Sequence, residues 1–223
     1  QRQMCIRDRS CSPDFGTQGV IERFSQIKPK LLIITDRYYY NGKEINIIER
    51  LPAILKKIKS IKSVLIINYP GKKSLKQKKV KRVNFFYYKK LRDTKETKFQ
   101  FKKFDFDKEL AILYSSGTTG KPKCICHRAG GVLLQHLKEH KLHCNVKPGD
   151  NVFYFTTCGW MMWNWLMTFL ASKASIVLFD GFPMYKRSDL LLKIAEKEKI
   201  SLFGISAKYI DQLKKLNLNI KTK

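Results

Sequence analysis

Short apolar runs rich in β-branched residues recur along the chain, and the segments between them repeat apolar residues at helical spacing. Runs of this kind are typical of strands buried on both faces. The expected strands are residues 31–35, 63–67, 110–114, 152–155, 175–179 and 202–205. The expected helices are residues 19–27, 44–58, 130–143, 160–170, 188–199 and 207–216, the last capped by Ser206. This alternation predicts an α/β fold with a mostly parallel sheet flanked by helices.

A loop rich in glycine and hydroxyl residues follows the third expected strand. It reads Ser115-Ser116-Gly117-Thr118-Thr119-Gly120-Lys121-Pro122-Lys123. Glycine lets backbone N–H groups turn toward an anion, hydroxyls add donors, and lysine adds positive charge. Ligands of parallel sheets bind at the carboxyl ends of strands, where this loop lies. The loop predicts a site for the phosphates of a nucleotide, and the competing interpretation is a flexible surface turn.

The spacing of this loop excludes a Walker-type phosphate loop. Two residues separate Gly117 from Gly120, where the Walker loop has four. Pro122 stands where the Walker loop has serine or threonine after its lysine. Proline also biases Lys121 toward an extended backbone, so a helix cannot start directly at that lysine.

Segment 113–123 resembles the phosphate-binding signature of the adenylate-forming enzymes, which include acyl-CoA synthetases, luciferases and peptide-synthetase adenylation domains. Other motifs resemble the acetoacetyl-CoA synthetase branch of that family. They are residues 11–16, 40–43, 127–128, 130–131, 133–134, 136–137, 148–150, 155–164, 203–204 and 206–210. The resemblance covers nearly the whole chain from Cys11 onward, and it implies part of the large N-terminal domain of such an enzyme.

The resemblance implies a ligase that activates acetoacetate with ATP and transfers it to CoA, releasing AMP and pyrophosphate. A synthetase for another short-chain acid, such as acetate or propionate, stays open as an alternative. The implied catalytic residues are Thr118, Thr119 and Lys123. The residues implied to bind the ATP phosphates are Ser115, Ser116, Gly117, Thr118, Thr119, Gly120 and Lys123. Mg²⁺ is expected to be held mainly by ATP and by family residues outside this chain.

Two further sites follow from the resemblance. Thr157, Gly159 and Trp160 are expected to line the acyl-substrate pocket, and the competing interpretation of their segment is a core helix. Met161, Trp165 and Leu166 are expected in the core. Phe15 and Gly16 are expected where the CoA nucleotide docks, near residues 40–43. Family members often have arginine in that turn, where this chain has tyrosines.

A cluster of Cys124, Cys126 and His127 could suggest a metal site. Only three ligands gather there, so we expect no metal. His127 and Arg128 are instead expected to shape the turn into a helix, in which Gly130 and Gly131 allow close approach to the sheet or to a ligand. His136, His140 and His143 are expected on the surface or between helices rather than as catalytic bases.

Composition narrows the class of protein. With 223 residues, 43% of them hydrophobic, the chain can build a substantial core. Its apolar runs are shorter than the roughly 18 residues that cross a bilayer, so we expect a soluble protein without a membrane partner. Six cysteines without a CxxC pair favour reduced thiols and a cytoplasmic location.

The formal charge of +27 raises a rival hypothesis from another class, a basic nucleic-acid-binding module. Basic residues are densest at residues 72–103, where they interleave with the aromatic residues 85–88. Because lysines are spread along most of the chain, we expect no specific nucleic-acid partner. We expect the aromatic residues 85–88 to belong to a strand. Small molecules are the expected partners, and the oligomeric state is not predicted.

The two ends of the chain shape the expected domain organisation. Residues 1–10 fall outside the resemblance and are expected to be a non-native leader. Residues 11–223 are expected to form a partial AMP-binding domain with a basic connector at 68–105. The family's later motifs and mobile C-terminal domain are not in this sequence, so the 223 residues alone are expected to be inactive.

Overall fold

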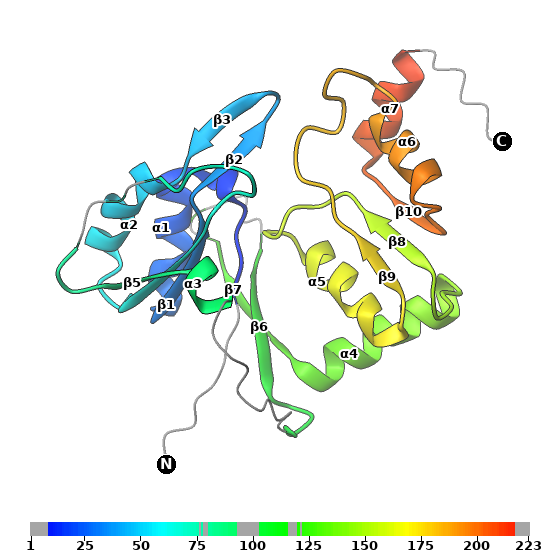
Figure 1. The fold of residues 1–223 in the computed structure, drawn as a ribbon. Coiled ribbons are helices and arrows are strands. Elements are labelled where there is room, and N and C mark those ends of the chain that lie inside the picture. The colour runs from blue at the N-terminus through cyan, green and yellow to red at the C-terminus, as the bar shows by residue number, and fades with distance from the viewer. Residues whose placement is uncertain are drawn as a thin grey trace. The chain divides into compact units, whose positions relative to one another are not determined.

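The computed structural model describes residues 9–75, 77, 80–92, 103–115, 120 and 122–216. The chain divides into two compact units. The N-terminal unit comprises Cys11–Phe104 and Tyr114–Ile125, and the C-terminal unit comprises Gln1–Ser10, Asp105–Leu113 and Cys126–Lys223. Each unit contains a three-stranded parallel sheet (Figure 1).

The sheet of the N-terminal unit has the strand order β1-β4-β5. Its strands are β1 (Leu31–Thr35), β4 (Ser63–Ile67) and β5 (Asn84–Tyr87). Helices α1 (Gly16–Ile27) and α2 (Leu51–Lys57) pack their apolar side chains against alternate side chains of the strands, and both sets are buried there. The core on this face includes Phe24, Ile54 and Leu55 from the helices, together with Val64 and Ile66 from β4.

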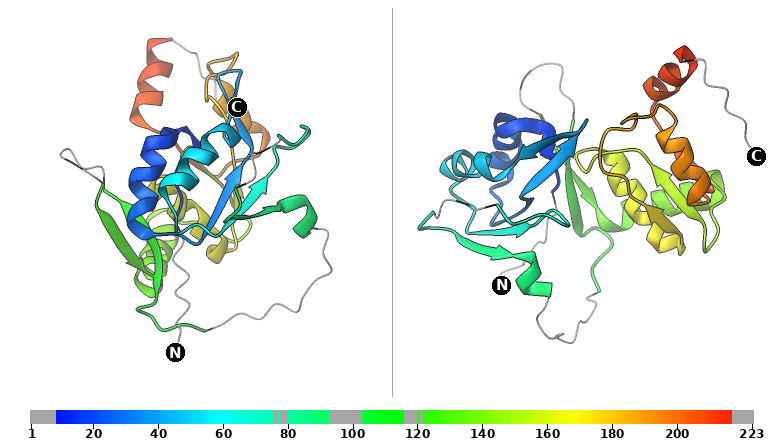
Figure 2. Two further views of the ribbon diagram at one scale, coloured as in Figure 1. Left: turned by 90° about the vertical axis from the view of Figure 1, so that its left-hand side faces the viewer. Right: turned by 45° about the horizontal axis from the view of Figure 1, so that its top comes forward.

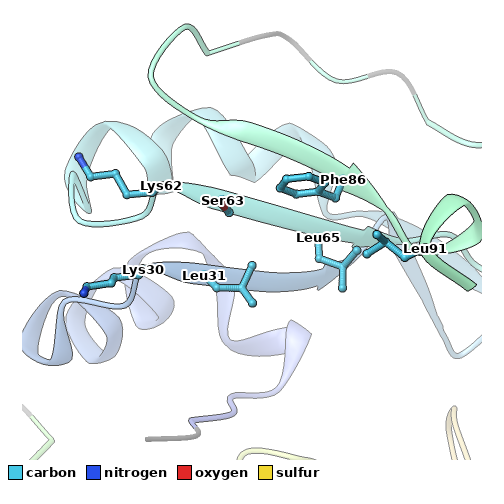
Figure 3. Close-up of a pocket in the computed structure, with 7 residues that line it drawn as sticks. All are labelled: Lys30, Leu31, Lys62, Ser63, Leu65, Phe86 and Leu91. Carbon is cyan, nitrogen blue, oxygen red and sulfur yellow. The ribbon is translucent and has the colours of Figure 1, made fainter. Parts of the chain in front are cut away.

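The opposite face of this sheet carries exposed apolar side chains. Leu31 is 51% exposed, Ile33 55% and Phe86 44%. The short helix α3 (Tyr88–Arg92) contacts β4 and β5. A hollow of about 430 Å³ lies here, and Figure 3 shows its lining of Lys30, Leu31, Lys62, Ser63, Leu65, Phe86 and Leu91.

A hairpin follows β1 and corrects one sequence expectation. Strands β2 (Arg37–Tyr40) and β3 (Lys43–Asn46) pair antiparallel, whereas a helix was expected from residue 44. The turn residues Asn41 and Gly42 have φ values of 47° and 77°, the left-handed values that a tight hairpin turn requires. The helical part of the expected segment begins later, with η2 (Ile48–Arg50) and α2.

A buried ionic cluster anchors this hairpin to the sheet. Asp36 is fully buried, and its carboxylate accepts hydrogen bonds from the Tyr69 amide at 2.9 Å and from Arg37 at 3.3 Å. Arg37 also donates to Glu44 of β3 at 2.9 Å. Burial alone raises the pKa of Asp36, but hydrogen bonds from Tyr69, Asn68 and Arg37 outweigh it and hold the pKa below its usual value.

The sheet of the C-terminal unit has the order β10-β8-β9. Its strands are β8 (Asn151–Tyr154), β9 (Ser175–Val177) and β10 (Leu202–Gly204). One set of alternate strand residues packs with α5 (Met161–Met167) and η4 (Thr168–Ser172). The other set packs with α6 (Leu190–Lys197) and α7 (Ala207–Lys215), which Figure 2 shows from two further directions. This sheet is covered on both faces.

The remaining elements carry the loop that the sequence singles out. Strands β6 (Glu109–Tyr114) and β7 (Cys124–Arg128) form a two-stranded sheet. Helix α4 (Ala129–Lys138) follows β7 and continues as the π-helix η3 (Glu139–His143). Among the described residues, no helix has the length and apolar character needed to cross a membrane.

The fold class predicted from the sequence is confirmed, and each expected strand coincides with an observed strand to within two residues at either end. Of the aromatic residues 85–88 that were expected in a strand, 85–87 lie in β5, whereas Tyr88 begins α3. The expected helix at 207–216 is also confirmed, because the Ser206 hydroxyl accepts a hydrogen bond from the Tyr209 amide and caps α7. Residues 76, 78, 79 and 93–102 of the predicted basic connector lie outside the described residues.

Candidate active site

The predicted phosphate loop connects β6 to β7. Ser115, Gly120 and Lys123 are described, whereas Ser116, Gly117, Thr118, Thr119 and Lys121 lie outside the described residues. The amide of Ser115 donates a hydrogen bond to the carbonyl of Lys123 at 3.0 Å. This bond joins Ser115 and Lys123, the first and last residues of the predicted loop.

Gly120 has the backbone freedom that anion binding requires. Its φ is +96°, a value that residues with a side chain rarely adopt. A Cβ placed there would meet no heavy atom of the described residues within 4 Å. The described part of the chain therefore leaves space for a ligand beside the Gly120 backbone.

Helix α1 contacts both ends of the loop within the N-terminal unit. The Tyr114 hydroxyl, at the end of β6, donates to the carbonyl of Arg23. The Gln26 side-chain amide donates to the carbonyl of Pro122 at 3.1 Å. The Cys124 thiol, at the start of β7, lies 3.5 Å from the Gln26 side-chain oxygen. The last two turns of α1 thus hold the segments that enter and leave the loop.

The residues expected to dock CoA lie at the other end of the same helix. Phe15 ends the short helix η1 (Pro13–Phe15), and Gly16 begins α1 with a φ of +63°. A Cβ on Gly16 would meet no heavy atom of the described chain within 4 Å, so the backbone is accessible to a ligand. The guanidinium of Arg23 lies 4.4 Å from the centre of the Phe15 ring and 5.8 Å from that of Tyr114.

The expected acyl-substrate residues lie at the carboxyl end of β8 in the C-terminal unit. Thr157 and Gly159 occupy the connection from β8 to α5, and Trp160 immediately precedes that helix. The Thr157 hydroxyl is buried and has no hydrogen-bond partner within the described part of the chain. A buried polar atom without a partner is unfavourable, so a polar ligand that reached it would supply the missing hydrogen bond. This observation fits an acid-binding pocket.

The segment after Thr157 partly corrects the expected core. Trp160 is 58% exposed, which leaves its indole accessible. Trp165 and Leu166 are buried as expected. Met161, the first residue of α5, was expected in the core but is 49% exposed, whereas the next residue, Met162, packs against the core.

Two glycines allow close packing beside these segments. A Cβ on Gly130 would lie 2.2 Å from the Phe106 ring, so this glycine permits the approach of α4 that the sequence predicts. A Cβ on Gly204 would lie 2.1 Å from the Tyr154 ring. The structural role of Gly204 was missed, although a glycine at the end of an apolar strand is a signal of close approach.

Two histidines of the α4–η3 segment, His136 and His140, are buried by packing between helices. His140 is fully buried and stacks on Phe169 with ring centroids 3.5 Å apart. Burial, together with the nearby His136, lowers the pKa of His140 to about 4. His136 is also buried, 3.0 Å from the Thr168 hydroxyl, and burial lowers its pKa as well. Both are neutral at pH 7 and lie between helices.

The cysteines considered as metal ligands lie on β7, the extended segment that the sequence suggests. Among the residues that the structure describes, no three His, Cys, Asp or Glu side chains form a group that could hold a metal ion. Arg128 at the end of β7 donates to the carbonyl of Asp107 at 2.7 Å. This bond fixes the turn from β7 into α4.

Comparison with known proteins defines the class that these features suggest. Residues 10–223 match the family described as AMP-binding enzyme, and the chain belongs to this family. Its curated relatives include the acetoacetyl-coenzyme A synthetase of Rhizobium meliloti (strain 1021), which is 45% identical over 207 residues, or 92% of this chain and 31% of the relative. The acetoacetyl-CoA synthetase of Gallus gallus is 42% identical over 94% of this chain and 32% of the relative.

A similar solved structure supports the same family assignment. The acetoacetyl-CoA synthetase from Streptomyces lividans matches 94% of this chain with a TM-score of 0.85 and 36% sequence identity. The match covers 31% of that protein. The chain therefore spans about a third of the length of the relatives that it matches.

Proposed function

We propose that this chain is the part of an acetoacetate–CoA ligase that binds the ATP phosphates and forms one wall of the acid pocket. The observation that carries the proposal is the glycine- and hydroxyl-rich loop, closed by the bond between Ser115 and Lys123, in a chain similar to acetoacetyl-CoA synthetases over most of its length. Acetoacetate, ATP and CoA are the proposed substrates, with Mg²⁺ accompanying ATP.

In the first proposed step, a carboxylate oxygen of acetoacetate attacks the α-phosphorus of ATP. The bond to the β-phosphate oxygen breaks, giving acetoacetyl-AMP and pyrophosphate. Negative charge increases on the leaving phosphates. Loop N–H groups, the hydroxyls of Thr118 and Thr119, and the ammonium of Lys123 would stabilise that charge more in the transition state than in the ground state.

In the second proposed step, the thiolate of CoA attacks the carbonyl carbon of acetoacetyl-AMP and displaces AMP. Phe15 and Gly16 would contact the nucleotide part of CoA from the start of α1. Thr157 would offer its unpartnered hydroxyl to an oxygen of the acid, and Trp160 would supply an apolar wall. A short polar acid suits a pocket that combines these two groups.

The test uses the protein expressed from the complete reading frame that encodes this chain. Pyrophosphate exchange into ATP is measured with acetoacetate, acetate and propionate, followed by AMP formation after addition of CoA. We expect acetoacetate to give the highest kcat/KM. A higher value with acetate or propionate would overturn the proposed substrate, and no exchange with any acid would overturn the proposed activity.

The residue assignment has its own test in the same protein. Thr118→Ala, Thr119→Ala and Lys123→Ala are each expected to slow pyrophosphate exchange by about 10²-fold or more, as for the loss of one donor to a transition-state anion. Thr119→Ser keeps a hydroxyl and is the matched control, expected to retain most of the rate. Wild-type exchange in all three alanine variants would overturn the assignment.

A further inference from the structure

We infer that α1 is the positioning element of the phosphate loop, and that Gln26 is a positioning residue for the phosphates. This inference rests on the proposed function for its catalytic consequence. Its structural part depends only on contacts within the N-terminal unit.

One Gln26 side chain contacts the segment that leaves the loop at two points. Its amide nitrogen donates to the carbonyl of Pro122 at 3.1 Å. Its oxygen lies 3.5 Å from the Cys124 thiol, which donates to it. Because Lys123 lies between these two contacts in sequence, its backbone is held from both sides. Substitution of Gln26 is therefore expected to displace the backbone of Lys123, the lysine proposed to bind the phosphates.

The segment that enters the loop is tied to the same helix one turn earlier. The Tyr114 hydroxyl donates to the carbonyl of Arg23, and Ser115 follows directly. The Ser115 amide in turn donates to the carbonyl of Lys123. The residues that flank the loop are thus bonded to each other and to α1, so a shift of either flank would break a contact to this helix.

Helix α1 is itself fixed in the core of its unit. Phe24 is buried, and Val20, Ile21 and Ile27 pack against the same cluster. Gln26 is exposed on the opposite side of the helix, so its substitution leaves the core unchanged. Substitution of Gln26 therefore removes its loop contacts, and one bond within α1 to the Glu22 carbonyl at 2.9 Å, without a loss of core packing.

Arg23 extends the connection to the other end of α1. Its guanidinium lies over the Phe15 ring at 4.4 Å and near the Tyr114 ring at 5.8 Å, while its Nη1 donates to the Gly19 carbonyl at 3.1 Å. Phe15 is a residue proposed to dock CoA, and Tyr114 leads into the phosphate loop. The same helix therefore sets the position of both groups.

The first test measures amide hydrogen exchange in the 223-residue chain, without any need for activity. In Gln26→Ala we expect the amides of Ser115 and Cys124 to exchange about 5-fold faster, as for the loss of a hydrogen bond worth about 1 kcal/mol. The matched control is Gln18→Ala, because the Gln18 amide bonds Glu22 within α1 at 2.9 Å and contacts no loop residue among those described. Equal exchange in the two variants would overturn the inference.

The second test uses the protein from the complete reading frame. Gln26→Ala and Tyr114→Phe are expected to lower kcat for pyrophosphate exchange about 10-fold while the KM for the acid stays unchanged, because a misplaced loop loses transition-state contacts. Gln26→Asn, which keeps the amide on a shorter side chain, is expected to recover part of the rate.

The outcomes separate the two proposals. Faster exchange of the Ser115 and Cys124 amides with unchanged kcat would reduce Gln26 to a structural residue and overturn its positioning role. A wild-type protein inactive with every acid would overturn the proposed function. In that case the hydrogen-exchange result would still decide whether α1 holds the loop.

Discussion

The two parallel sheets of this protein have strands of similar apolar sequence but different surroundings. In the C-terminal unit, Val152 and Phe153 are neighbours on β8 that face opposite sides, and both are buried. In the N-terminal unit, Leu32 is buried beneath the helices, whereas its neighbour Leu31 is half exposed. An apolar strand sequence therefore shows that both faces of a sheet can be buried. The neighbouring helices determine which faces are buried.

The largest expected effect tests the doubly covered sheet. Phe153→Ala is expected to lower the free energy of unfolding of the C-terminal unit by about 3–5 kcal/mol, because Phe153 packs among Leu191, Tyr209 and Leu213. Urea denaturation followed by tryptophan fluorescence measures it, since all three tryptophans of the chain, Trp160, Trp163 and Trp165, belong to this unit. A loss below about 1 kcal/mol would contradict the described cover of this face.

A matched pair on β4 tests the singly covered sheet. Ile66→Ala is expected to cost about 2–5 kcal/mol, because Ile66 is fully buried against the helices. Ile67→Ala, one residue later on the other face, is expected to cost less than about 1 kcal/mol, because Ile67 is 38% exposed. Hydrogen exchange of the β1 and β4 amides measures both. Equal losses would show that the two faces are equally covered in solution.

The buried histidine makes the stability of the C-terminal unit depend on pH. The pKa of His140 is about 4 in the folded protein, against 6.5 for the ordinary side chain, so the unfolded state binds a proton more readily. With respect to His140, the free energy of unfolding is therefore highest above pH 6.5. It falls as the pH drops toward 4, by at most about 3 kcal/mol in total. Tryptophan-monitored urea titrations between pH 7 and 4 measure this decline.

Two histidine variants sharpen this prediction. His140→Gln is expected to weaken the pH dependence, leaving the contribution of His136, whose pKa is also lowered by burial. His143→Gln, on the exposed end of the same π-helix, is the matched control and should keep the wild-type dependence. An unchanged slope in His140→Gln would contradict the assignment.

The smallest expected effect concerns a helix that covers one face of the C-terminal sheet. Ser206→Ala removes the hydroxyl that accepts from the Tyr209 amide at 3.3 Å at the start of α7. The expected cost is about 1 kcal/mol, the usual value of such a cap. Ser206→Asp keeps an acceptor and should retain wild-type stability in the same urea titration. A loss of several kcal/mol in Ser206→Ala would mean that more than the cap had been removed.

Hydrophobic pattern alone was enough to predict six of the strands, because short runs rich in apolar and β-branched residues are typical of buried strands. It was not enough for the hairpin after β1, where Glu44 and Ile45 alternate between a polar and an apolar side. The dipeptide Asn41-Gly42 is the local signal for such a turn and favours a hairpin over the helix that was expected. The division into two sheets depends on long-range pairing, which no local pattern specifies.

The candidate site was predictable to a different degree in its two parts. The loop was found from its glycines and hydroxyls, because this composition has a direct chemical use. The role of Gln26 was not predictable, since its contacts with Pro122 and Cys124 join residues almost a hundred positions apart. The burial of His140 was equally hidden, because a histidine in a helix has the same sequence context inside or outside a core.

Strand order has a consequence for how the chain folds during synthesis. In the N-terminal sheet the spatial order β1, β4, β5 repeats the order of the chain, so each new strand can add to an existing edge as it leaves the ribosome. In the C-terminal sheet β9 can add to one edge of β8 and β10 to the other, so this sheet can also grow strand by strand, but from a later part of the chain. The N-terminal sheet, with Leu31 and Ile33 exposed, can therefore form first, and the nascent chain would show this apolar face to chaperones before the second unit has folded.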